Sequence, residues 1–146
     1  FIIGGGHMTL IKLSELGETP YQQLLGHNEQ LLQSWTTLAQ TIEQNLHLQP
    51  KVVEEIRRML AHQSGCSYCK SKGKPEGSKA QFNPKELTAI GFTEVYMTMG
   101  TNIPNYLFQE LYKVMTDEEI AMLIAYIQFT ECQQKFGALL QLEATD

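Results

Sequence analysis

Residues 50–69 read PKVVEEIRRMLAHQSGCSYC and join an amphipathic segment to a Cys-x-x-Cys pair. In the first part, apolar side chains recur every three or four residues, at Val52, Val53, Ile56, Met59 and Leu60. That spacing is typical of a helix with one face on a core. Pro50 is well tolerated in a first helical turn, and Gly65 stands where a helix commonly stops. The stretch therefore predicts a helix from Pro50 to about Ser64, with Cys66 starting a new turn.

The rest of the chain also has the pattern of helices. Apolar residues at helical spacing predict further helices at residues 20–25, 29–45, 84–99, 105–115 and 116–140. Asn28 is expected to cap the second of these, and Thr116 to Glu119 form a capping box. Residues 70–79 hold two glycines, a proline and four lysines, and are expected to form a loop. No alternating apolar pattern predicts a strand, so the expected fold class is all-α.

Size and charge narrow the class of protein. At 146 residues the chain fits one domain with its own core. We interpret residues 1–7 as a cloning remnant ahead of Met8, and residues 8–146 as a single helical domain. A formal net charge of −5 argues against a nucleic-acid surface. No apolar run approaches the roughly 18 residues of a membrane span, so we expect a cytoplasmic protein with no membrane contact.

The Cys-x-x-Cys pair carries the chemistry. Three cysteines are too few for a disulfide framework, and in a reducing compartment such a pair is more often redox-active or metal-binding. Only a thiolate attacks a disulfide or peroxide, and a helix N-terminus with nearby lysines favours the thiolate. Two other interpretations stay open: a zinc site completed by His62 and Cys132, or two inert buried cysteines. We expect Cys132 itself to be a core residue.

Several pieces of the chain together resemble the carboxymuconolactone decarboxylase family, in its alkyl-hydroperoxidase-D-like branch. The pieces are Leu24 to Leu32 with Trp35, Glu54 to Cys69, and Thr116 to Ile120 with Phe136 to Leu139. The resemblance covers nearly all of Met8 to Glu143. It implies an all-α fold that assembles into trimers or hexamers. It also implies thiol-dependent reduction of peroxides, fed by a partner dithiol, with no organic cofactor and no metal.

The resemblance also implies the site residues. The family motif is a Glu, a Cys-x-x-Cys twelve residues later, and a His four residues after the second Cys. Glu54, Cys66 and Cys69 match this motif, whereas Gly73 stands at the His position. The second cysteine attacks in the family, so Cys69 would attack and Cys66 would resolve the intermediate. The helix-end argument alone favours Cys66 as the attacking residue.

A replacement for the missing His follows as a hypothesis from the chain direction. If residues 64–65 turn the chain, His62 before the turn and Cys69 after it face each other. A neutral imidazole is suited to take a thiol proton. Glu54 would lie about 16 Å back along the helix. There it could serve as a water-mediated relay, or simply as a glutamate favourable beside a helix N-terminus.

The leading hypothesis is a thiol-dependent disulfide oxidoreductase and peroxidase, an antioxidant protein acting through Cys66 and Cys69 with Glu54 and His62 in support. Its partners would be a peroxide substrate, a dithiol electron donor and further copies of the chain. The alternative is a catalytically degraded member of the same family that works as an oligomeric binding or scaffold protein. The missing His favours the alternative, whereas the intact cysteine pair favours the enzyme.

Overall fold

Six helices and a small hairpin make up the part of the chain that the computed structural model describes, which is residues 2–4, 7–64, 69, 71, 73, 75 and 81–143. The helices are α1 (Pro20–Leu25), α2 (Glu29–Gln44), α3 (Pro50–Ser64), α5 (Pro84–Met99), α6 (Asn105–Val114) and α7 (Asp117–Leu139). The strands are β1 (Ile2–Gly4) and β2 (His7–Thr9). Cys66 and most of the predicted loop lie outside the described residues.

The predicted helices are confirmed, with ends that differ by about one residue. Local caps explain the agreement at the N-terminal ends. The Asn28 side chain accepts a hydrogen bond of 2.9 Å from the Leu31 N–H, and so caps α2. At the start of α7, Thr116 and Glu119 exchange the two hydrogen bonds of a capping box. The all-α fold class therefore holds from α1 to α7.

The N-terminal hairpin is a departure from the expected absence of strands. β1 and β2 pair antiparallel, with Ile2 opposite Thr9 and Gly4 opposite His7. We set residues 1–7 aside as a remnant and expected no strand after them. The expectation of no strand is wrong, because the backbone of residues 7–9 forms β2. Ile2 and Ile3 are β-branched, a side-chain shape that favours extended pairing.

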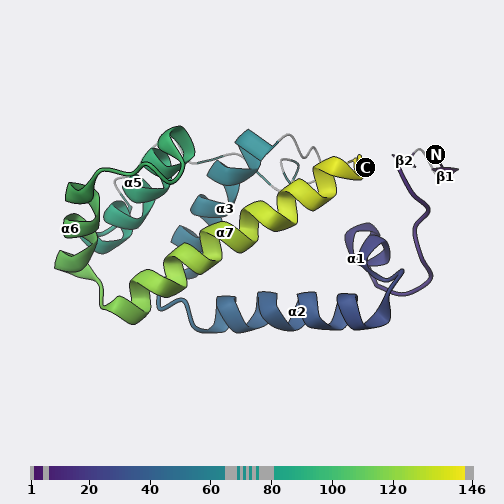
Figure 1. The fold of residues 1–146 in the computed structure, drawn as a ribbon, viewed down its shortest axis with the longest axis horizontal. Coiled ribbons are helices and arrows are strands. Elements are labelled where there is room, and N and C mark those ends of the chain that lie inside the picture. The colour runs from purple at the N-terminus through teal and green to yellow at the C-terminus, as the bar shows by residue number, and fades with distance from the viewer. Residues whose placement is uncertain are drawn as a thin grey trace.

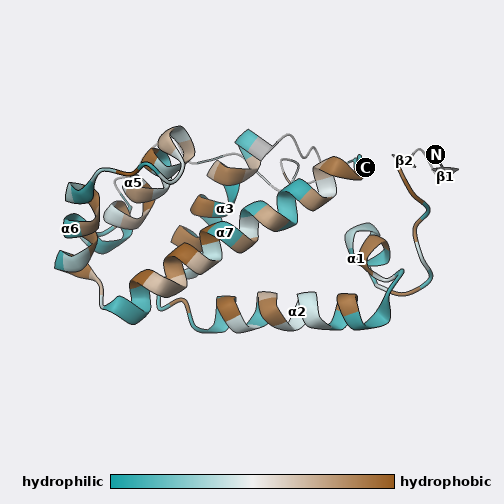
Figure 2. Cartoon of the chain, in the orientation of Figure 1, coloured by the Kyte–Doolittle hydropathy of each residue, from teal (hydrophilic) through white to brown (hydrophobic). Residues whose placement is uncertain are grey.

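The main core lies where α3 and α7 run side by side, closed at one end by α5 and α6 (Figure 1). Figure 2 shows apolar residues concentrated on these neighbouring stretches. The buried members include Val52, Ile56, Ile90, Leu111, Leu123 and Ile127. Two hydrogen bonds also join α7 to α3: the Tyr126 hydroxyl donates to the Val53 carbonyl at 3.1 Å, and Gln134 Nε2 donates to the Arg57 carbonyl at 3.2 Å.

A second contact joins α1 and α2 to the far half of α7. The rings of Tyr21 and Trp35 both pack on Phe136, with centroid distances of 5.5 and 5.3 Å, and Trp35 also packs on Phe129 at 5.5 Å. The Tyr21 hydroxyl donates to the Gln133 carbonyl at 2.6 Å. Aromatic pairs at these distances add stability beyond simple burial. This arrangement leaves a hollow between α1, α2 and α7, beside the end of α3.

Candidate functional site

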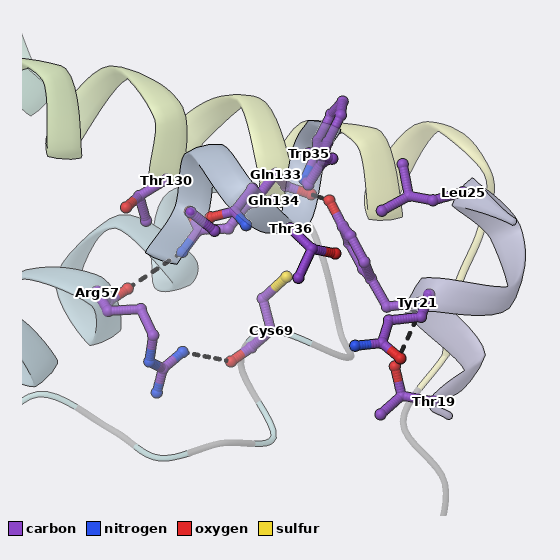
Figure 3. A pocket seen from close by; sticks show the side chains of 12 residues that line it. Thr19, Tyr21, Leu25, Trp35, Thr36, Arg57, Cys69, Thr130, Gln133 and Gln134 are labelled. Carbon is purple, nitrogen blue, oxygen red and sulfur yellow. Dashed lines mark hydrogen bonds between the residues drawn. The ribbon is translucent and has the colours of Figure 1, made fainter. Parts of the chain in front are cut away.

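The hollow is a pocket of about 310 Å³ with an open side. Its walls come from α1, α2, α3 and α7, together with Cys69 (Figure 3). The lining residues are Thr19, Tyr21, Gln22, Leu25, Trp35, Thr36, Ala39, Arg57, Cys69, Thr130, Gln133 and Gln134. Most of this lining is apolar or uncharged, which is typical of a site for a small organic molecule. The pocket is therefore the candidate functional site.

Cys69 is the one cysteine among the described residues that line the pocket. Only 7% of the residue is exposed to bulk solvent, and it packs against Ala61 and Ala138. Its sulfur takes part in a disulfide, and Figure 3 shows that sulfur turned toward Thr36 on the pocket side. Cys66, the other cysteine of the pair, lies outside the described residues. Cys69 is thus a largely buried residue that borders an open pocket.

Arg57 holds the backbone of Cys69 in place. Its Nη1 donates a hydrogen bond of 3.1 Å to the Cys69 carbonyl, on the side away from the sulfur (Figure 3). The same guanidinium donates to both carboxylate oxygens of Glu54, from Nε at 2.9 Å and from Nη2 at 2.7 Å. The Arg57 side chain is only 17% exposed. A guanidinium presents several donors in a fixed plane, so one residue can serve both partners at once.

Glu54 is an ion-pair partner in this structure. The hydrogen bond from Arg57 lowers the pKa of Glu54, burial opposes that shift, and the charges of Arg57 and Arg58 lower it further. A carboxylate held ionised in this way is a poor proton acceptor near neutral pH. The expectation of a first-turn glutamate is wrong, because Glu54 lies beyond the first turn of α3, whereas a role as a relay stays a prediction.

Gly73 explains why the family His cannot simply be restored. Its φ of +132° is a conformation that side chains rarely adopt. A Cβ added there would lie 2.9 Å from Nε of Arg58. A histidine at position 73 would therefore need both a different backbone and a displaced arginine. The backbone conformation at position 73 and the nearby Arg58 side chain therefore disfavour the histidine that the family has there.

His62 does not enter the pocket. It lies exposed in the last turn of α3 and is not one of the residues that line the pocket around Cys69. Its predicted contact with Cys69 has no support in the described geometry. The expectation for Cys132 is wrong: this free cysteine is exposed on α7. Apolar neighbours in the sequence had suggested a core position, but its own side chain lies on the outer face of the helix.

The pocket also contains residues that sequence reasoning did not single out as functional. Trp35 entered only as one of the residues that carry the family resemblance. No sequence pattern described above pointed to Arg57, Tyr21 or Gln134. The spacing of Glu54 and Arg57 at i and i+3 is the one sequence signal that could have indicated the ion pair. Nothing local could have shown that Gln134 lies 3% exposed beside a cysteine 65 positions earlier.

Two features are missing from the described residues: a cluster of possible metal ligands and a membrane-spanning helix. No group of three or more His, Cys, Asp or Glu side chains among them is arranged to hold a metal ion. No helix in this part of the chain is both long and apolar enough to span a bilayer.

Comparisons with solved structures identify the fold. The debrominase Bmp8, in its apo form, matches with a TM-score of 0.72 and 17% identity over 86% of this chain and 77% of its own. A protein of unknown function from Agrobacterium tumefaciens, ATU0492, described as a candidate antioxidant defence protein AhpD, matches with a TM-score of 0.69 and 14% identity over 84% of this chain and 96% of its own. No family model and no curated protein matches the sequence. The chain thus has the AhpD-like helical fold, as the resemblance implied.

Proposed function

We propose that this chain is a thiol–disulfide oxidoreductase of AhpD-like fold, in which Cys66 and Cys69 alternate between dithiol and disulfide. The observation that carries the proposal is the position of Cys69, whose sulfur forms part of the wall of an open 310 Å³ pocket and belongs to a disulfide. Because its sulfur lies on the pocket side, Cys69 is the attacking residue in this proposal and Cys66 is the resolving residue.

The reaction with a disulfide substrate balances without further reagents. The Cys69 thiolate attacks one sulfur of R–S–S–R, which forms a mixed disulfide and releases one thiolate. The Cys66 thiolate then attacks the Cys69 sulfur, which releases the second thiolate and closes the Cys66–Cys69 disulfide. A donor dithiol reduces this disulfide by the same two exchanges and becomes oxidised itself.

Peroxide reduction is the slower reaction in this proposal. There the Cys69 thiolate attacks one oxygen of R–O–O–H, the sulfur becomes a sulfenic acid, and the leaving alkoxide takes up a proton. Cys66 then displaces water to close the disulfide. An alkoxide is a much stronger base than a thiolate, so its departure gains far more from a general acid. Among the described residues that line the pocket, none is a His, Asp or Glu.

Arg57 and Glu54 support the chemistry as a unit. The guanidinium fixes the Cys69 carbonyl at 3.1 Å and brings a positive charge to the backbone of the reacting residue. Glu54 orients that guanidinium with two hydrogen bonds and offsets most of its charge. A cationic neighbour favours the thiolate form of a cysteine. Arg57 and Glu54 are therefore positioning residues, and His62 has no part in the proposed reaction.

Disulfide turnover with a dithiol donor tests the proposal. Wild-type protein should exchange a small disulfide faster than it consumes a hydroperoxide, and Cys66→Ser and Cys69→Ser should each abolish net turnover. Cys132→Ser is the matched control, because it removes an exposed cysteine outside the pocket, and it should leave the rate unchanged. Equal rates in all four proteins would support the alternative, a scaffold protein without thiol chemistry.

Assembly is a separate part of the proposal. We propose a trimer or hexamer in solution, as the resemblance implies. Several large apolar side chains support contact with further copies because they are exposed, among them Tyr106 at 64%, Tyr112 at 63% and Leu139 at 75%. Light scattering of the purified protein measures the assembly directly, and a monomer at micromolar concentration would contradict it.

A further inference from the structure

Two buried polar atoms in the pocket have no hydrogen-bond partner among the described residues, and they are of opposite kinds. Nε1 of Trp35 carries a hydrogen to donate, whereas Oε1 of Gln134 can only accept. Both residues line the pocket beside Cys69, one from α2 and one from α7 (Figure 3). Buried polar groups in folded proteins are nearly always paired, because leaving one unpaired is costly. The two atoms therefore point to a molecule that enters the pocket.

The amide orientation of Gln134 follows from its neighbour. The residue is 3% exposed, and its amide contacts the backbone carbonyl of Arg57 at 3.2 Å. A carbonyl can only accept, so the group facing it must be the NH₂ of the amide. Its oxygen is therefore left as an acceptor, fixed in direction because the side chain is buried and anchored.

The Trp35 ring is fixed in a similar way. It packs between Phe129 and Phe136, at centroid distances of 5.5 and 5.3 Å. An indole N–H usually finds a partner when it is buried. Held by two rings, Trp35 cannot turn its N–H toward solvent without breaking this packing. The donor on α2 and the acceptor on α7 thus belong to two side chains that are held in place and line the same pocket.

The charge of the pocket narrows the ligand class further. Arg57 is the one formally charged side chain among the described lining residues, and Glu54 neutralises it with two hydrogen bonds. A charged ligand would lose its hydration there without gaining a free counter-charge. The remaining lining is largely apolar. A neutral ligand with an apolar body and one hydroxyl or similar group fits all of these features.

We propose that Trp35 and Gln134 form a hydroxyl-binding subsite, which selects small neutral disulfides that carry a hydroxyl group close to the sulfur. The hydroxyl oxygen accepts from Trp35 Nε1 and its hydrogen is donated to Gln134 Oε1. The inference rests on the proposed function for the chemistry that follows, but the subsite itself is a matter of binding alone. The subsite determines which substrate the pocket binds and does not change the order of the exchange steps.

Binding can be measured without any reaction, since the chain contains a single tryptophan and that residue is Trp35. Its emission reports directly on occupation of the pocket. The probes are bis(hydroxyethyl) sulfide and dipropyl sulfide, which differ only by hydroxyl in place of methyl and cannot exchange with thiols. We expect the hydroxylated sulfide to bind at least about fivefold more tightly to reduced wild-type protein, as one added hydrogen bond would give.

Gln134→Met should remove this preference, because methionine has a similar length and no acceptor oxygen of this kind. Gln128→Met is the matched control: it makes the same change on the same helix at an exposed position outside the pocket, and should keep the preference. Gln134→Met also loses the hydrogen bond to Arg57, so Trp35→Phe provides a second variant. It keeps an aromatic ring, lacks the N–H, and should lose the preference when binding is measured by calorimetry.

The results separate the subsite from the enzyme. Equal affinity for the two sulfides, no binding of either, or a preference that persists in both variants would overturn the subsite. Turnover of bis(hydroxyethyl) disulfide and dipropyl disulfide is then measured separately. A binding preference without any exchange would overturn the proposed function and leave the subsite standing. Exchange of both disulfides at equal efficiency would overturn the subsite and leave the enzyme.

Discussion

Replacement of Arg57 by methionine removes the side chain that holds the Cys69 backbone and should leave the rest of the fold intact. Methionine keeps an unbranched stem of similar length and removes the guanidinium. The hydrogen bond to the Cys69 carbonyl involves a charged donor, which corresponds to about 1.5 kcal/mol or more. The pair with Glu54, whose side chain is 42% exposed, adds about 0.5–1 kcal/mol. The expected loss in the free energy of unfolding is therefore about 2 kcal/mol.

Exchange should also slow under conditions in which the variant is fully folded, so the loss of stability alone does not account for the effect. At temperatures where Arg57→Met remains folded, we expect disulfide exchange to slow about tenfold, because an offset of about 1.4 kcal/mol in the positioning and ionisation of Cys69 corresponds to that factor. Stopped-flow exchange with a small disulfide measures the rate, and urea unfolding of the same sample measures the stability.

Arg58→Met is the matched control for this experiment. Arg58 also contacts Glu54, at 3.3 Å, whereas it is Arg57 that donates to the Cys69 carbonyl. It should cost about 0.5 kcal/mol or less and leave the exchange rate within a factor of two or so. If the two arginine variants slow exchange equally, the reasoning that gives Arg57 its role through the Cys69 carbonyl is refuted.

Three further predictions concern neighbouring charges and the missing histidine. Glu54→Gln should speed exchange or leave it nearly unchanged, because it exposes the cysteine to an uncompensated cation; a large loss of rate would instead indicate a proton relay. Gly73→His should destabilise the protein by about 1–3 kcal/mol, because of the positive φ and the close Arg58 side chain, and hydroperoxide assays should show no gain. The hydrogen bond from Lys85 lowers the pKa of Glu119 from 4.5 to about 2. The stability from that pair is therefore full above about pH 4.5 and is lost as pH falls toward 2. Glu119→Gln, which retains the capping geometry, should flatten this part of the acid unfolding curve.

The fold could be predicted because its signals are local. Asn28 and Thr116 cap their helices with their own side chains, and Pro50 begins α3 where its ring is tolerated. Each of these signals acts within one turn of the chain. The N-terminal hairpin was missed because it depends on pairing between two three-residue segments, which leave no periodic pattern.

The pocket could not be predicted because its walls meet only in three dimensions. Periodicity predicted the apolar face of α3, and it could not show that Arg57, at another position of the helix, meets Cys69 and α7. Gln134 stands among polar neighbours in the sequence and is nevertheless buried. His62 seemed well placed because a turn at residues 64–65 was assumed to fold two segments back on each other. The direction that the chain takes after a helix depends on packing as well as on the turn residues. His62 remains exposed at the end of α3.

Arg57 links the two halves of the proposed site. Its backbone carbonyl fixes the Gln134 amide at 3.2 Å, and its side chain fixes the Cys69 carbonyl at 3.1 Å. A substrate hydroxyl held by Gln134 would therefore keep a defined position relative to the Cys69 sulfur, because Arg57 anchors both Gln134 and Cys69. Rate enhancement by orientation depends on such shared anchoring, and small misplacements are costly. Arg57→Met removes the side-chain contact with Cys69 but not the backbone carbonyl, so it should slow exchange and keep the hydroxyl preference, whereas Trp35→Phe should weaken the hydroxyl preference and leave exchange of dipropyl disulfide intact.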